Sequence, residues 1–233
     1  PIETPNVVFR VRDLLCHIVL EIRDVVRVWG QITTQLFHTF RAIHTPKAHY
    51  LRGMKDHADH PVRQLEPQNL WNRFADLNAI PRPSKHEGRV VEWLHQWASE
   101  KGLQSLQDEV GNVLIKKDAT PGMENRKTVV LQSHVDMVCQ KNEATDFDFM
   151  TEGIRMVVDG DWVRADGTTL GADNGIGVAS ILAVLESSDV AHPALEALFT
   201  IDEETGMTGA LGLQGGFLSG DILLNLDTED DLS

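Results

Sequence analysis

The sequence predicts an α/β fold in which a mixed or mainly parallel sheet is flanked by helices. Short apolar runs that are typical of buried strands recur along the chain, and segments with apolar residues at helical spacing lie around them. Three of the runs end directly before a polar motif, and they are residues 128–132, 195–201 and 222–226. Strands that deliver polar side chains at their carboxyl ends build a crevice there, so we expect a functional site at that edge of the sheet.

Two helices are predicted before the first of these strands. From Pro67, which suits a first helical turn, apolar residues share one helix face, and Pro81-Arg82-Pro83 ends that helix. Ser84 and Glu87 then form a capping-box signature for a second helix. Gly102 is expected to end the second helix, because glycine commonly follows a helix carboxyl terminus.

The other predicted elements follow in order along the chain. They are strands at residues 103–107, 112–116, 154–158 and 162–165, and a helix at residues 174–185. The turn residues Asp159-Gly160-Asp161 join two of these strands and predict a β-hairpin. No internal repeat or low-complexity tract interrupts the pattern.

Residues 1–53 differ in charge from the rest, and we expect two units, an extension over residues 1–53 and a domain over residues 54–233. The extension has seven Lys or Arg against four Asp or Glu, about +3, which leaves about −17 for the rest because the chain carries −14. An apolar stripe predicts one amphipathic helix, formed by Val11, Leu15, Ile18, Ile22, Val25 and Trp29. This helix is either a coiled-coil or partner helix, or part of a non-native extension with Met54 as the natural start. We favour the non-native extension.

Composition excludes several classes of function. The strongly acidic balance argues against a nucleic-acid partner, because phosphate binding needs a basic face. Cys16 and Cys139 lie too far apart in sequence to form a disulfide framework, which fits a reducing, cytoplasmic compartment. No run of eighteen apolar residues and no signal-peptide layout is present, so we expect no membrane partner.

Two of the polar motifs contain the residue types of a metal site. His134 and Asp136 are two residues apart just beyond a strand, so both side chains fall on the same side of the chain. One of them can bind a metal ion while the other orients a metal-binding side chain through a hydrogen bond. The alternative is a loop histidine with surface hydrogen bonds. Asp173 lies between Gly171 and Gly175 and is either a metal ligand or a plain helix cap. A phosphate loop is excluded, because the glycine spacing and a following Gly-Lys-Ser are missing.

Two further motifs supply carboxylates. Glu203 and Glu204 follow a strand, and in extended geometry their side chains diverge, so one can bind metal while the other acts as a general base. A solvated acidic turn is the alternative for this pair. Asp227 begins an acidic stretch that is either a ligand position or an exposed tail. One histidine with several carboxylates suits divalent zinc, manganese or cobalt.

Residues 66–231 resemble the aminoacyl-histidine dipeptidases, which are cytosolic Xaa-His dipeptidases in the co-catalytic zinc exopeptidase family of carboxypeptidase G and the aminoacylases. The resemblance is carried by residues 121–127, Leu131-Gln132-Ser133-His134-Val135-Asp136-Met137-Val138, Gly167-Thr168-Thr169-Leu170-Gly171-Ala172-Asp173-Asn174-Gly175-Ile176-Gly177, residues 203–207 and residues 212–215. The form Thr-Thr-Leu-Gly-Ala-Asp-Asn-Gly is specific to this branch. The resemblance extends over only the amino-terminal part of the family's protein.

The resemblance implies a role for each candidate residue. The metal ligands would be His134, Asp173, Glu204 and Asp227, with His134 and Asp227 on one metal, Glu204 on the other and Asp173 between them. Asp136 would orient His134, and Glu203 would be the general base. The cofactors would be two divalent ions, zinc first, with manganese or cobalt as alternatives.

The resemblance also implies an activity and a partial domain. The expected function is hydrolysis of Xaa-His dipeptides by a water that two metals activate, and the alternatives are a related amide deacylase or a non-catalytic metal-binding fragment. The fold would be an incomplete catalytic domain, without the family's lid domain and its last histidine ligand. The full-length parent is expected to be a homodimer through that lid, and the 233-residue chain alone is expected to be inactive.

Overall fold

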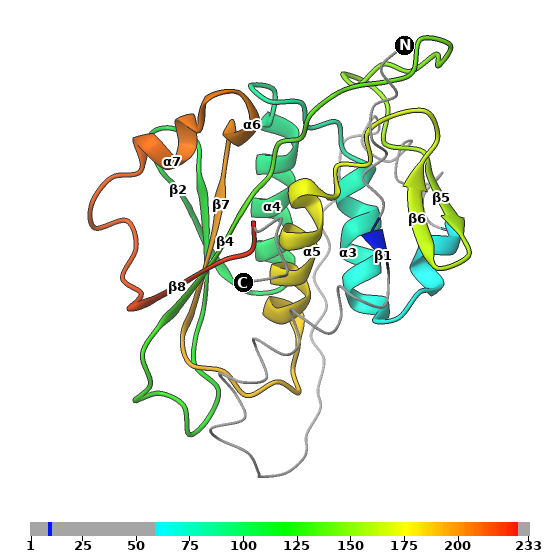
Figure 1. Ribbon diagram of the computed structural model, residues 1–233. Coiled ribbons are helices and arrows are strands. Elements are labelled where there is room, and N and C mark those ends of the chain that lie inside the picture. The colour runs from blue at the N-terminus through cyan, green and yellow to red at the C-terminus, as the bar shows by residue number, and fades with distance from the viewer. Residues whose placement is uncertain (1–8, 11–58, 228–233) are drawn as a thin grey trace.

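A five-stranded mixed sheet forms one outer layer of the computed structural model, which describes residues 9–10 and 59–227 (Figure 1). In spatial order the strands are β2 (Gln104–Gln107), β3 (Val113–Lys117), β7 (Leu195–Thr200), β4 (Val129–His134) and β8 (Ile222–Asn225). The strands β7, β4 and β8 run parallel, whereas β2 and β3 pair antiparallel. The predicted α/β fold with a mixed sheet is therefore confirmed.

Three helices pack beside this sheet. The helices α4 (Gly88–Glu100) and α5 (Ala172–Glu186) lie on one face, against alternate buried residues of β3, β4 and β7, as a pleated strand requires. The third helix, α3 (Gln68–Asn78), packs against α5 on the side away from the sheet (Figure 1). The helix α5 is apolar almost all round, as expected for a helix that is covered on both sides. Its burial holds it in place, and with it the residues at its amino terminus.

A second, smaller sheet lies beyond α3. The strands β5 (Met156–Asp159) and β6 (Trp162–Ala165) form the predicted hairpin, and β1 (Phe9–Arg10) pairs with β6. A second apolar cluster joins this hairpin to α3 and α5, and the short 3-10 helix η1 (Pro61–Gln64) packs at its edge. None of the helices in the described part of the chain is long and apolar enough to cross a membrane.

Two expectations from the sequence need comment. The expected capping box at Ser84 and Glu87 is wrong, because α4 begins at Gly88 without a side-chain cap and both side chains bond elsewhere. The amphipathic helix expected from Val11 to Trp29 lies outside the described residues. The extension over residues 1–53 and the domain over residues 54–233 remain predictions.

Candidate functional site

The carboxyl ends of β4, β7 and β8 meet at one edge of the sheet. His134, the last residue of β4, is level with Thr200 at the end of β7, and Gln132 is level with Asn225 at the end of β8. Side-chain hydrogen bonds from Gln132 to Thr200 and from Asn225 to Gln132 tie the three strand ends together. The segments that follow β7 and β8 therefore start beside His134, as the strand positions predict.

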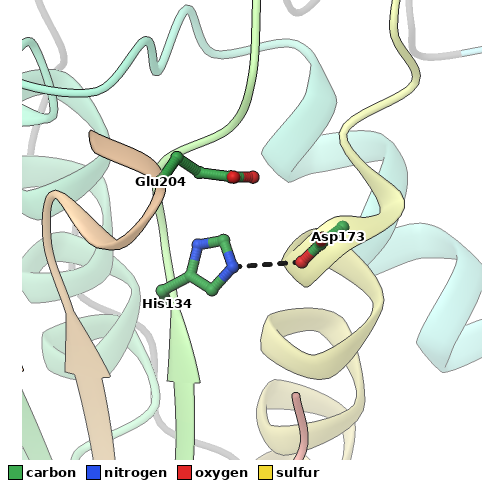
Figure 2. Close-up of side chains that lie close together, drawn as sticks. All are labelled: His134, Asp173 and Glu204. Carbon is green, nitrogen blue, oxygen red and sulfur yellow. Dashed lines mark hydrogen bonds and ion pairs between the residues drawn. The ribbon is translucent and has the colours of Figure 1, made fainter. Parts of the chain in front are cut away.

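His134 is the centre of the site. Its side chain is buried, and its Nδ1 atom lies 3.2 Å from Asp136 Oδ1. The other ring nitrogen, Nε2, lies 3.1 Å from Asp173 Oδ1 and 3.8 Å from the nearest carboxylate oxygens of both Glu203 and Asp227. Figure 2 shows the imidazole at the end of β4, with Asp173 reaching it from the start of α5 and Glu204 above it.

Two overlapping groups of possible metal ligands share this imidazole. The first is His134, Asp173 and Glu204, and the second is His134, Glu203 and Asp227. Within each group the ligand atoms lie within 4.8 Å of one another. The structure thus brings together all four side chains expected to bind metal, and it places Glu203, expected to be the base, in the second group.

Asp173 is held at the site by the irregular start of α5. Gly171 precedes this helix with a left-handed backbone (φ +67°), and Asp173 and Asn174 have non-helical backbone angles. The Asn174 amide donates to the Leu226 carbonyl at 3.0 Å, next to Asp227, and the Ser133 hydroxyl donates to Asn174. The start of α5 is therefore bonded to β4 and to the chain after β8, which connects three of the segments around the site.

Asp136 is a buried acceptor that organises its neighbours. Besides lying next to His134, its carboxylate accepts hydrogen bonds from the Ser84 hydroxyl at 2.7 Å and from the backbone N–H groups of Glu203 and Glu204 at 3.1 and 3.2 Å. Burial raises the pKa of Asp136, but the hydrogen bonds from His134 and Ser84 outweigh it and hold the pKa at about 2. Asp136 therefore stays ionised and contacts both the imidazole and the Glu203–Glu204 backbone.

Glu203 and Glu204 diverge in a way that differs from the expected extended chain. They open the short helix α6 (Glu203–Gly206), directly after Asp202, whose φ is +49°. The helix α7 (Thr208–Gly212) follows at once. Burial is the largest effect on both Glu203 and Glu204 and raises their pKa. The imidazole of His134 lowers the pKa, but burial together with repulsion from neighbouring carboxylates outweighs it. Carboxylates with raised pKa values are suited to accept protons or to bind cations.

Sequence reasoning gave Ser84 and Glu87 a different role. Ser84 donates to Asp136, and Glu87 Oε1 accepts from the backbone N–H groups of Lys85 at 2.8 Å and Asp202 at 3.0 Å. Of these contacts only the one between Glu87 and Lys85 is local in sequence, because Ser84 bonds the side chain of Asp136 and Glu87 also bonds Asp202. They serve the loop before α6 instead of the helix α4.

The donor set fits divalent cations. Burial lowers the pKa of His134, but hydrogen bonds with Asp136 and Asp173 raise it more, to about 10. The surrounding carboxylates therefore stabilise a positive charge at this position, and the buried His134 ring stays protonated at neutral pH. Imidazole nitrogen with carboxylate oxygen is the ligand set of zinc, and manganese or cobalt accept similar ligands.

A cavity of about 220 Å³ opens beside this cluster. Its walls come from residues 138–142 and 164–172, and Asp173 and Glu204 border it on the side of His134. Apolar residues such as Val138 and Leu170 line it together with Thr168. A small molecule in this cavity would therefore touch the carboxylates of the first ligand group.

Comparison with known proteins identifies relatives over most of the described residues. The chain is 56% identical over 170 residues to the cytosol non-specific dipeptidase of Escherichia coli, across 73% of this chain and 35% of that protein. The crystal structure of the aminoacylhistidine dipeptidase from Vibrio alginolyticus matches with a TM-score of 0.72 and 55% identity, over 76% of this chain and 36% of that one. The predicted resemblance to the aminoacyl-histidine dipeptidases is confirmed.

The match to these dipeptidases is partial in length. The chain spans about a third of each of them, 35% and 36%. A tripeptidase from Staphylococcus aureus shares the fold at 24% identity, with a TM-score of 0.60 over 72% of this chain and 45% of that one. No family model matches the sequence.

Proposed function

We propose that this chain carries the cation-binding part of a metal-dependent dipeptidase that acts on Xaa-His dipeptides. The observation that carries the proposal is the convergence of His134 with Asp173, Glu204 and Asp227 at the carboxyl edge of the sheet. The name of the Vibrio alginolyticus relative supports the Xaa-His substrate class, and the name of the Escherichia coli relative supports dipeptides in general and a cytosolic location.

The proposed ligands would hold two divalent ions. His134 and Asp227 would bind one ion, Glu204 would bind the other, and Asp173 would contact both, as the short distances around His134 Nε2 support. When bound, such ions lower the pKa of water from about 15.7 towards about 7 and polarise a carbonyl group. Zinc is the first candidate, because imidazole and carboxylate are its ordinary ligands, with manganese or cobalt as alternatives.

The remaining residues would move or hold protons. Asp136, ionised and 3.2 Å from Nδ1, would keep a proton on that nitrogen, so that Nε2 is free to bind a cation. Glu203 would take a proton from the attacking water and pass it to the leaving amine of the dipeptide. The raised pKa of Glu203, caused first by burial, brings this carboxylate closer to the pH at which it would work.

The experiment compares two proteins, because the chain matches about a third of its relatives. One is the purified chain, and the other is a chimera in which residues 59–227 replace the matching part of the Escherichia coli dipeptidase. Bound metal is counted, and hydrolysis of an Xaa-His dipeptide is measured beside that of an N-acyl amino acid.

We expect both proteins to bind divalent cations and the chimera to prefer the dipeptide. Preference for the N-acyl amino acid would favour a related deacylase instead. Cation binding without any hydrolysis in the chimera would reduce the proposal to a non-catalytic metal-binding fragment. Absence of cation binding in both would refute the site.

A further inference from the structure

Arg82 lies behind the proposed site with almost no exposure to solvent. Its residue surface is 1% exposed, and it follows α3 in the segment that leads to α4. Its Nη1 atom donates to the carbonyls of Val135 at 3.0 Å and Asp136 at 3.1 Å, and its Nη2 atom donates to the Asn78 side chain at 3.0 Å and the Gly171 carbonyl at 2.6 Å. Both terminal nitrogens are therefore committed to fixed acceptors.

These acceptors are adjacent to the proposed ligands. Val135 directly follows His134, and Gly171 comes two residues before Asp173. A single planar guanidinium thus joins the loop after β4 to the loop before α5, the two segments whose ligand atoms lie 3.1 Å apart. Burial lowers the pKa of Arg82 to about 10, against the raising effect of Asp136 first among its acidic neighbours, so the group stays charged at neutral pH.

Two glycines, Gly171 and Gly175, leave the space that the Arg82 guanidinium occupies. A Cβ atom added to Gly171 would overlap Arg82 Nη2, and one added to Gly175 would lie 2.8 Å from it. Asn78, fully buried, donates its amide to the Leu170 carbonyl at 3.1 Å while its oxygen accepts from Arg82. The two glycines of the Asp173 motif therefore have a packing reason, which is the close approach of the Arg82 guanidinium.

We propose that Arg82 is a positioning residue that sets the spacing between His134 and Asp173 and thereby the cation affinity of the site. The inference rests on the proposed function for the identity of the ligands. Lysine cannot replace arginine here, because its single ammonium group cannot span four acceptors arranged for a planar fork. Loss of the fork removes the Arg82 donor from the carbonyls of Val135 and Asp136 and leaves the Gly171 carbonyl with the Gly175 N–H at 3.2 Å, so the loops should separate or shift.

The test uses the 233-residue chain with Arg82→Lys and a matched control, Arg73→Lys. Arg73 lies within α3 and is less buried than Arg82, with 19% of its side chain exposed, and its partners are Asp76 at 3.0 Å and Glu186 at 3.6 Å, away from the ligands. Zinc and manganese affinities are measured by calorimetry at a temperature at which every variant is folded by circular dichroism. In the metal-free chain, long-range ¹H–¹⁵N spectra of the His134 ring report its contacts with Asp136 and Asp173.

We expect Arg82→Lys to weaken cation binding by about 10- to 100-fold and to shift the His134 ring signals. Arg73→Lys should lower thermal stability while it leaves both readouts close to those of the parent chain. If Arg82→Lys does not fold, Gly175→Ala, whose Cβ would press on Nη2, is measured in the same way and should weaken binding too.

The outcomes separate this inference from the proposed function. Affinity in Arg82→Lys within about twofold of the parent would overturn the positioning role and leave the cation site intact. If neither the parent chain nor the chimera binds a cation, the proposed function fails, and the metal-free spectra alone then test the positioning role of Arg82. Ring signals of His134 that stay unchanged in Arg82→Lys would overturn the inference, whereas a shift confined to that variant would support it.

Discussion

Glu203 and Glu204 are neighbours in sequence, but each belongs to a different ligand group around His134. If Glu203 is the base, Glu203→Gln in the chimera should lower turnover of an Xaa-His dipeptide by at least about 100-fold, because an amide cannot accept the proton. Bound metal per chain should stay as in the parent. Turnover and metal content are measured on the same samples, and loss of metal would instead make Glu203 a ligand.

Asp136 offers a second test at the scale of one residue. Asp136→Asn keeps the shape but removes the charge that faces His134 Nδ1 and the two backbone N–H groups of α6. We expect cation affinity to fall by about 10- to 100-fold, since the imidazole loses its orienting partner. A calorimetric titration with zinc checks this, and unchanged affinity would show that Asp136 only stabilises the fold.

Residue types and their order predicted the members of the candidate site but not all their contacts. His134, Asp173 and Asp227 follow strands or open a helix, so chain topology alone brings them to one edge. The contacts of Arg82 and Ser84 depend on how loops far apart in sequence pack together, for example Ser84 with Asp136. A local capping motif looks the same in sequence whether its side chains cap a helix or bind a distant loop.

The turn between β7 and α7 positions Glu203 and Glu204. This turn packs closely against Gly209, where there is no room for a side chain. An added Cβ at Gly209 would overlap the Asn112 side chain and lie 2.7 Å from the backbone nitrogen and oxygen of Ile201. Gly209→Ala should therefore destabilise the chain by about 1–3 kcal/mol and weaken cation binding. Urea unfolding checks this against Gly215→Ala, where nothing lies within 4 Å of the added Cβ and the change should stay within about 0.5 kcal/mol.

Glu196 on β7 gives a pH-dependent prediction away from the site. Its buried carboxylate pairs with Lys116 at 2.8 Å and accepts from the backbone of Ser219 and Gly220, which leads into β8. Burial raises the pKa of Glu196, but these partners lower it below its ordinary value of 4.5. The stabilisation is thus present above pH 4.5 and is lost as pH falls through the lowered pKa.

The matching variant is Glu196→Gln. It should be less stable than the parent by about 1.5–3 kcal/mol at pH 7, since it loses hydrogen bonds to a charged acceptor. The difference should shrink below pH 4.5, where the parent carboxyl becomes protonated. Unfolding in urea at a series of pH values measures it, and a difference that persists unchanged at low pH would contradict the ionic role.

At the scale of elements, the strands and main helices were predictable because apolar periodicity reports burial. The runs at residues 128–132, 195–201 and 222–226 became β4, β7 and β8 with small changes at their ends. The helical turn at Glu203 was not predictable, because four residues carry no periodicity and Asp202 with its positive φ is not a glycine. Hydrogen bonds from the backbone of Asp202 and Glu203 to the distant side chains of Glu87 and Asp136 stabilise that turn.

At the scale of the whole molecule, the charge difference between residues 1–53 and the rest predicts that the extension is dispensable. Deletion of residues 1–53 should change the thermal unfolding midpoint by no more than a few degrees, because of this charge difference. Of the extension, the structure describes only Phe9 and Arg10, which pair with β6. Differential scanning calorimetry of both forms measures this. A large drop on deletion would show that the segment belongs to the fold.

The two ligand groups share one imidazole, so the two proposed ions cannot be held equally well. Nδ1 of His134 faces Asp136, which leaves Nε2 for a single ion, and the other ion then has only Asp173 and Glu204 among the described residues. A catalytic zinc usually has three protein ligands. Calorimetric titration of the chain should show one tight and one weaker site, and a separate assay should show no meaningful dipeptide hydrolysis. Two equally tight sites would contradict the assignment.

The most direct test of the central claim is anomalous diffraction from crystals of this chain grown with zinc. We expect a peak about 2.0–2.2 Å from His134 Nε2 and from carboxylate oxygens of the cluster, Asp173 foremost. The buried acidic group of Glu87, Asp136 and Asp202 serves as an internal comparison, because its oxygens already accept backbone and hydroxyl donors. A peak there, or none near His134, would contradict the account.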